Sequence, residues 1–243
     1  MDCSSDYSDT SGDAVLITTT ASVATTIEFS PPLSQNKTAA MRKVHYSSST
    51  KVILVFHEPF WENTENVGGN TITDLPLKVM YYPNKASKSG VGVLLASYTW
   101  GTDSLRFTGM SDEAVIEESL LGVAKIHNRP YSFVKELYMS GHVKRWTADE
   151  NTLGAFLALK PYQTMAYQNE LSRSEEGIYF AGEHTESPHG WMDTAIKSGV
   201  RAAAEIHLDQ DYSQSHPSKA PHPGTISVGY HQLQHQYVWT GGA

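Results

Sequence analysis

Cysteine is nearly missing from this chain, because Cys3 is the single one among 243 residues. One thiol cannot close an internal disulfide, so no covalent bridge within the chain supports the fold, and the redox compartment stays undetermined. The length is enough for a sizeable core, either in one large domain or in two small ones.

Positive charge and long apolar runs are also scarce. The 18 Lys and Arg residues are scattered and are outnumbered by 26 Asp and Glu, which gives a net charge of -8. This balance argues against a nucleic acid or an anionic membrane surface as a partner. No run approaches the ~18 apolar residues of a membrane span. Residues 1–6 lack the basic start and apolar stretch of a signal peptide, so the sequence as it stands predicts no entry into the secretory pathway.

The pattern G-x-G-x-x-G, which holds the pyrophosphate of a dinucleotide, does not occur. Gly90 and Gly92 form a lone pair inside an apolar run, and Val93, Leu94 and Leu95 follow where the third glycine would be needed. We therefore expect no dinucleotide-binding turn of this type in the chain.

Strands and helices are both predicted, which places the chain in the α/β class with mixed α+β character. Ser111 has the chemistry of an N-cap, and Pro130 suits the first turn of a second helix. Residues 21–27 are expected to form a short helical turn. Apolar, β-branched runs predict strands at 14–20, 51–56, 90–98 and 178–181.

Residues 177–206 are the most informative segment. The run 178–181 predicts a buried strand, and Gly182 ends it with a residue that lets a ligand approach the backbone. Helical spacing follows, with an expected buried face of Met192, Ile196, Gly199, Val200, Ala203 and Ile206 and another face of Lys197, Arg201 and Glu205. Two interpretations stay open at this point. The segment is either one βα unit of an α/β domain, or a helix N-terminus that favours an electron-rich ligand.

The amino-acid sequence of this segment decides between the two interpretations. Tyr-Phe-Ala-Gly-Glu-His-Thr, His-Gly-Trp and Ala-Ile-Lys-Ser-Gly-Val-Arg-Ala-Ala closely resemble the C-terminal flavin-binding segment of the flavin amine oxidases, above all the L-amino-acid oxidases. The resemblance runs in order from about Ala14 to Leu208, through Val-His-Tyr-Ser-Ser-Ser-Thr-Lys, Gly-Gly-Asn-Thr-Ile-Thr-Asp-Leu-Pro and Lys-Arg-Trp-Thr. It implies FAD as the cofactor, and the chain looks like the C-terminal half of such an enzyme.

The resemblance also implies a domain arrangement interleaved in sequence. Residues 14–44 and 172–208 would belong to a partial FAD-binding α/β domain, and residues 45–171 to a mixed-sheet substrate-binding domain. Residues 1–13 and the tail 209–243, rich in Ser, Gln, His, Pro and Gly, are expected to be disordered. Because β-strands of the first domain would lose their neighbours, exposed apolar sheet edges are expected as well.

Lys51 is the expected catalytic residue. On the residues alone it is equally well a strand-edge lysine that reaches solvent. In the superfamily, a lysine at this place holds a water next to flavin N5. Tyr98 matches the phenol that donates to the substrate carboxylate, and Phe156 falls where the family lines an apolar side-chain pocket. An apolar wall suits apolar or aromatic amino acids.

The remaining expected contacts are with the cofactor and the substrate amine. Gly190 and Trp191 match the pair that lies against the amine. In oxidases of uncharged amines a tyrosine more often replaces this tryptophan, so the tryptophan favours an amino-acid substrate. The positions that match the family's flavin-binding residues are Trp146, Gly182, Glu183, Trp191, Met192, Asp193 and Thr194.

The implied activity is oxidative deamination of L-amino acids by FAD and O2, which gives 2-oxo acids, ammonia and hydrogen peroxide. Two alternatives stay open: another flavin monoamine or polyamine oxidase, or a catalytically inactive truncated homologue. Without the pyrophosphate-binding turn, we expect weak or no flavin binding by this chain alone. The family is often homo-oligomeric and commonly secreted or lysosomal.

Three smaller features complete the sequence. In some venom members of the family a disulfide joins the positions that are here Phe56 and Tyr138, and both cysteines are replaced together. Asn36 begins an N-glycosylation sequon, which matters only in a secreted chain. The tail histidines His216, His222, His231 and His235 could bind a metal, but scattered histidines in such a tail are more often solvated, so no metal site is expected.

Overall fold

The computed structural model describes residues 12–62, 68–83, 90–215, 227–231 and 236–240. It contains two compact units. Unit 1 is formed by residues 1–46 and 150–243, and unit 2 by residues 47–149. The chain thus leaves unit 1, builds unit 2 and returns to unit 1. The boundaries differ from the prediction, because residues 150–171 group with unit 1 instead of continuing the central domain.

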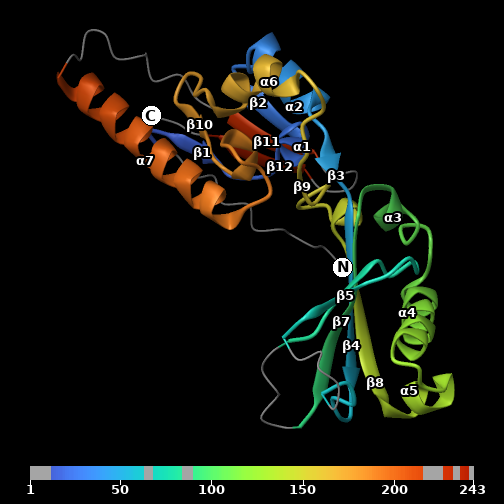
Figure 1. Cartoon of the computed structure of the whole chain (residues 1–243). Helices are drawn as coiled ribbons and strands as arrows, with labels where there is room; N and C mark the ends of the chain where they lie inside the picture. Colours follow the sequence, from blue (N-terminus) through green and yellow to red (C-terminus); the bar gives the residue numbers. More distant parts are fainter. Residues whose placement is uncertain (1–11, 63–67, 84–89, 216–226, 232–235, 241–243) are drawn as a thin grey trace, which may run out of the picture. The chain divides into compact units, whose positions relative to one another are not determined.

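Unit 2 is a five-stranded sheet with helices on one face (Figure 1). The strand order is β5-β6-β7-β4-β8, and within the described residues the pairs of this sheet are antiparallel. Its elements are β4 (Ser49–Phe56), β5 (Asn70–Ile72), β6 (Val79–Tyr81), β7 (Gly92–Trp100), α3 (Gly101–Leu105), α4 (Asp112–Ile126), α5 (Tyr131–Leu137), β8 (Tyr138–Arg145) and the 3-10 turn η1 (Trp146–Ala148).

Alternation along β4 explains how the sheet is covered. Val52, Leu54 and Phe56 are fully buried, whereas the residues between them are only half-buried. The buried face packs under α4, whose Leu120 and Val123 belong to the same core. Helix α4 begins as predicted, since the Ser111 side chain accepts a hydrogen bond from the backbone N–H of Ala114. The other face of the sheet carries the residues discussed below.

Phe56 and Tyr138 are strand partners at one end of the sheet. Their ring centroids lie 6.3 Å apart at an interplanar angle of 73°, a favourable edge-to-face contact. The two positions inferred from the family disulfide are therefore neighbours, and an aromatic contact joins them.

In the part of the chain that the structure describes, unit 1 combines a parallel strand pair with four α-helices and a three-stranded sheet. Strands β1 (Val15–Ile17) and β10 (Ile178–Phe180) pair in parallel, and β2 (Ile27–Ser30) pairs with β11 (Ser227–His231), which pairs with β12 (Gln236–Thr240). Strands β3 (Tyr46–Ser47) and β9 (Phe156–Leu157) form another pair. The helical elements are α1 (Ala21–Ala24), α2 (Gln35–Lys43), α6 (Gln163–Ser172), the 3-10 turn η2 (Glu183–Thr185) and α7 (Met192–Ser215).

The prediction of a disordered tail from residue 209 is wrong in part. Helix α7 continues to Ser215, and β11 and β12 add two strands to β2. Backbone pairing with a distant strand requires no apolar periodicity, so the polar composition hid it. The tail histidines lie outside the residues whose side chains are described. None of the helices in the described ranges has the length and apolar character of a membrane span.

Helix α7 packs through a different face from the predicted one. Thr194, Ser198 and Ala202 are buried, and these small residues let the helix approach η2 and β10. Ile196 and Val200, which were expected to be buried, are 69% and 66% exposed. An apolar stripe of this kind on the surface promotes association.

This stripe gives a first prediction. Replacing Ile196 with Glu and Val200 with Lys is expected to lower self-association of the purified chain, measured by sedimentation at increasing concentration, without lowering its melting temperature. Ala202→Glu is the matched control on the packed face of the same helix, where exposure is 0%. That change should destabilise the unit, since it buries a charge. Equal destabilisation by both changes would contradict the assignment of the two faces.

Candidate active site

The first cluster lies on the open face of the sheet in unit 2. Lys51 on β4 stands opposite Tyr98 on β7 and opposite Lys144 on β8. Its Nζ atom lies 4.5 Å from the centroid of the Tyr98 ring, within the range of a cation–π contact. The strand therefore places the predicted catalytic lysine and the predicted carboxylate ligand side by side.

Aromatic rings continue the cluster along this face. The Tyr98 ring centroid is 4.2 Å from that of Trp100 and 6.3 Å from that of Tyr81. Tyr81 and Trp100 are partly exposed. This row of flat rings beside an ammonium group forms an accessible surface suited to a planar or anionic ligand. Trp100 and Tyr81 were not predicted as site residues, although their strand positions, two residues along and one strand over from Tyr98, could have indicated them.

Trp146 is held by a neighbouring ion pair. It begins η1 directly after β8, and the Nζ atom of Lys144 lies 4.9 Å from its ring centroid. Lys144 also forms an ion pair with Asp149 at the end of the same turn. The lysine thus contacts both the indole ring of Trp146 and the carboxylate of Asp149. The predicted flavin contact Trp146 is therefore placed by a residue that the sequence did not single out.

The second cluster is the loop that follows β10 in unit 1. Gly182 has φ 136° and ψ 164°, a region that only glycine occupies readily. The next residue, Glu183, accepts hydrogen bonds from the backbone N–H of Leu157 at 2.9 Å and of Gly190 at 2.8 Å. One carboxylate thus ties β9 to the loop that precedes α7.

Glu183 brings the predicted substrate-binding residues of this unit together. A Cβ atom on Gly190 would lie 3.3 Å from Cδ2 of Phe156, so the glycine lies against the phenylalanine ring. Trp191 and Met192 follow at the start of α7 and are 65% and 85% exposed. The side chains of Trp191, Met192 and Asp193 are therefore accessible to a ligand that binds to unit 1.

Thr194 occupies a different environment from the other predicted cofactor contacts. Its side chain is buried on the packed face of α7, so a ligand at the helix start could meet only its backbone N–H group. Such N–H groups at a helix N-terminus favour electron-rich atoms.

His184 was not predicted as part of the site. It is buried directly after Glu183, and a Cβ atom on Gly182 would lie 2.7 Å from its Cε1 atom. Burial, reinforced by the nearby positive charges of Lys37 and Arg201, lowers the pKa of His184 to about 4. The imidazole is therefore neutral near pH 7 and serves as packing under the turn.

The two clusters belong to different units, and the predicted residues divide between them. Lys51, Tyr98 and Trp146 lie in unit 2. Unit 1 holds the others: Phe156, Gly182, Glu183, Gly190, Trp191, Met192, Asp193 and Thr194. No group of three or more His, Cys, Asp or Glu residues in the described ranges has the arrangement of a metal site.

Comparison with solved structures identifies the class of fold. Cyclohexylamine oxidase from Brevibacterium oxydans IH-35A matches with a TM-score of 0.67 over 82% of this chain and 43% of that chain, at 16% sequence identity. This chain therefore shares the fold of that amine oxidase, which confirms the predicted fold class.

Comparison with protein families gives the membership. The model of the flavin containing amine oxidoreductases matches residues 3–207, and the chain belongs to this family. L-amino-acid oxidase of Siganus canaliculatus is 47% identical over 205 residues, which are 84% of this chain and 38% of that protein. L-amino-acid oxidase of Mus musculus is 39% identical over 212 residues, 86% of this chain and 33% of that protein. The chain thus spans between a third and two fifths of the length of these relatives.

The family is named for its flavin, which agrees with the FAD predicted from the sequence. The residues present fit such a group. Gly182 follows the parallel strand β10 and has no side chain, and the start of α7 at Met192 has backbone N–H groups that no residue within the helix accepts. These are the elements with which α/β folds approach a nucleotide cofactor.

Proposed function

We propose that this chain carries the substrate-binding sheet and the C-terminal flavin-binding segment of an FAD-dependent L-amino-acid oxidase. The overall reaction would convert an L-amino acid, O2 and water into a 2-oxo acid, ammonia and hydrogen peroxide. FAD, when bound, accepts two electrons from the Cα–N bond and transfers them to O2. The protein residues bind and orient the amino acid.

The observation that carries this proposal is the pairing of Lys51 with Tyr98. An ammonium group and a phenol side by side on one sheet face can both donate hydrogen bonds, the phenol to a substrate carboxylate and the ammonium to a water molecule. Trp191 supports the same substrate class, because the sequence resemblance associates this position with the amine of an amino acid. The apolar ring of Phe156, which lies against Gly190, favours an apolar or aromatic side chain.

The Lys51 ammonium group is proposed to hold a water molecule that exchanges a proton near the reacting atoms. The Tyr98 hydroxyl group is proposed to donate a hydrogen bond to the substrate carboxylate. Trp146, fixed by Lys144, would provide a flat wall for the cofactor. In unit 1, Glu183 would keep Gly190 and Trp191 in place for the substrate amine. Homo-oligomerisation and a secretory or lysosomal location stay predictions from the family resemblance.

The test is a titration of the purified chain with FAD, followed by a peroxide assay. The chain is measured alone and together with the part of the Siganus canaliculatus enzyme that has no counterpart in it. L-leucine and L-phenylalanine are the amino-acid substrates, and 2-phenylethylamine, which lacks the carboxylate, is the control. Turnover of the two amino acids but not of 2-phenylethylamine supports the proposal. Preference for the amine would favour a monoamine oxidase, and no FAD binding in either condition would favour an inactive homologue.

Two substitutions make this test specific. Tyr98→Phe should raise the KM for L-phenylalanine about 10-fold, because a hydrogen bond to a charged group contributes about 1.5 kcal/mol or more, and leave the KM for 2-phenylethylamine unchanged. Lys51→Met should lower kcat about 100-fold, a typical loss for a group that moves a proton. Lys78→Met is the control for loss of charge. Lys78 lies outside the cluster and forms an ion pair with Asp103. Equal effects on both substrates would contradict the role given to Tyr98.

A further inference from the structure

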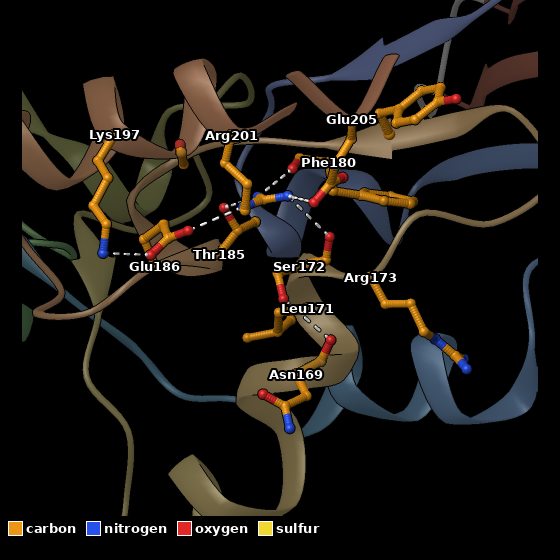
Figure 2. Close-up of polar contacts among 12 residues, drawn as sticks. Asn169, Leu171, Ser172, Arg173, Phe180, Thr185, Glu186, Lys197, Arg201 and Glu205 are labelled. Carbon is orange, nitrogen blue, oxygen red and sulfur yellow. Dashed lines mark hydrogen bonds and ion pairs between the residues drawn. The ribbon is translucent and has the colours of Figure 1, made fainter. Parts of the chain in front are cut away.

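Arg201 uses its whole guanidinium group to join α7 to the loop after β10 (Figure 2). Its side chain is 22% exposed and points into the packed side of the helix. It donates hydrogen bonds to Glu186 at 3.0 Å, Glu205 at 2.9 Å, the Phe180 carbonyl at 2.8 Å, Thr185 Oγ1 at 3.1 Å and the Ser172 carbonyl at 3.4 Å.

These partners lie at both ends of the turn that carries Glu183. Phe180 is the last residue of β10, and Thr185 is the last residue of η2. One nitrogen, Nη2, bonds to both. Since only four residues separate the two partners, the guanidinium fixes the distance between the entrance and the exit of the turn.

A second contact from α7 holds the middle of the same turn. Ser198 Oγ accepts a hydrogen bond from the backbone N–H of Gly182 at 2.8 Å, and Thr185 Oγ1 donates to the Gly182 carbonyl at 2.9 Å. Glu183 is thus placed between two residues that α7 holds. Its carboxylate can then reach Leu157 and Gly190.

The charges around Arg201 are balanced. Glu186 and Glu205 face the guanidinium, and Lys197 forms a second ion pair with Glu186 at 3.1 Å. A partly buried arginine is stable in such surroundings because each donor has an acceptor. Lysine has the same charge but cannot present a planar fork to several acceptors at once.

We propose that Arg201 is a positioning residue: it fixes the turn after β10 so that the Glu183 carboxylate holds the backbone of Leu157 and Gly190 in place. This inference rests on the proposed function, because the same turn and Gly190 are there assigned to the flavin and the substrate amine. It adds a residue that the sequence analysis did not predict as part of the site.

The test compares Arg201→Lys with Arg173→Lys. Arg173 is an ion-paired arginine of the same unit, and within the described residues its side chain bonds to the side chains of Ser34, Glu170 and Glu175. Hydrogen exchange of the Leu157 and Gly182 amides reports the turn, and exchange of the Val52 amide reports unit 2. We expect Arg201→Lys to accelerate exchange at Leu157 and Gly182 about 10-fold, with Val52 unchanged, and Arg173→Lys to alter none of them by more than 2-fold.

Two results would overturn the inference. Unchanged exchange at Leu157 and Gly182 in Arg201→Lys would show that the turn holds its position without the guanidinium. Equal acceleration at all amides of unit 1 would show a general loss of stability instead of positioning. Should Arg201→Lys fail to fold, Glu186→Gln serves as the second variant, because it removes one charged partner of Arg201 and leaves the carbonyl contacts. The hydrogen-exchange rates of the Leu157 and Gly182 amides are then expected to rise about 3-fold.

FAD titration of the same variants separates this inference from the proposed function. A roughly 10-fold weaker affinity in Arg201→Lys, with Arg173→Lys unchanged, supports positioning of the turn toward the cofactor. Faster exchange with unaltered FAD affinity would limit Arg201 to the fold and overturn its link to the cofactor. Absence of FAD binding in the unsubstituted protein, with its complementing part present, would contradict the proposed function, and the exchange measurement would still decide the role of Arg201.

Discussion

Gly182→Ala is expected to lower the free energy of unfolding by about 3 kcal/mol. The backbone at Gly182 has φ 136°, where a side chain is strained by about 1–3 kcal/mol. The new Cβ atom would also lie 2.7 Å from Cε1 and 2.8 Å from Nδ1 of His184. His184 is buried and cannot withdraw freely, so a cost of overpacking adds to the strain. Urea unfolding followed by circular dichroism measures the change.

Gly199→Ala is the matched control for this prediction. Gly199 lies in the middle of α7, and a Cβ atom there meets no atom within 4 Å. Alanine should therefore stabilise the helix by about 0.8 kcal/mol, through its higher helix propensity. The two substitutions add the same methyl group within 17 residues of each other but should act in opposite directions. A loss at Gly199 as large as that at Gly182 would contradict the account.

Lys37 should make the stability of unit 1 rise by about 2–3 kcal/mol between pH 8 and pH 10. The side chain is fully buried in α2. Its Nζ atom lies 3.9 Å from the Phe180 ring centroid and donates to the carbonyls of Leu171 and Arg173. Burial lowers the pKa of Lys37 from 10.5 to about 8, although Glu175 opposes the shift. Between these values the unfolded chain binds the proton and the folded chain does not, so stability rises with pH.

Above pH 10 the rise should reverse. Burial and the neighbouring Asp209 raise the pKa of Tyr179 to about 12, and burial also raises the pKa of Tyr46. The unfolded tyrosines then lose protons that the folded ones keep, which destabilises the fold. Chemical unfolding at a series of pH values measures the profile. Lys37→Met should abolish the rise from pH 8 to pH 10, whereas Lys43→Met, at an exposed position of the same helix, should leave it; an unaltered rise in Lys37→Met would refute the assignment.

Local sequence features predicted the individual elements well. Ser111 caps α4, Pro130 precedes α5, and residues 178–180 form the buried strand that their apolar run indicated. These outcomes depend on neighbouring residues and on burial, which composition and spacing encode directly. The resemblance to the amine oxidases supplied the fold and the family, which no local feature could.

Contacts between distant segments were the part that the sequence could not give. Arg201 was placed with Lys197 and Glu205 on a separate face of the helix, but its partners Phe180 and Thr185 belong to β10 and η2. Lys37 would ordinarily be expected in solvent, and its burial depends on carbonyls of Leu171 and Arg173, more than 130 residues away. Hydrogen-bonding capacity is visible in a sequence, whereas the position of the partner follows from the tertiary fold.

The contact between Phe56 and Tyr138 has a consequence for the conditions under which unit 2 can form. The edge-to-face contact of these two rings joins strands β4 and β8 and involves no redox chemistry. The chain's one cysteine is far from both residues in sequence. A reductant has no bond to cleave at this end of the sheet, and an oxidant has none to create. The closing of this sheet should thus proceed equally under a reducing and an oxidising thiol potential, unlike that of relatives in which a disulfide occupies the same place.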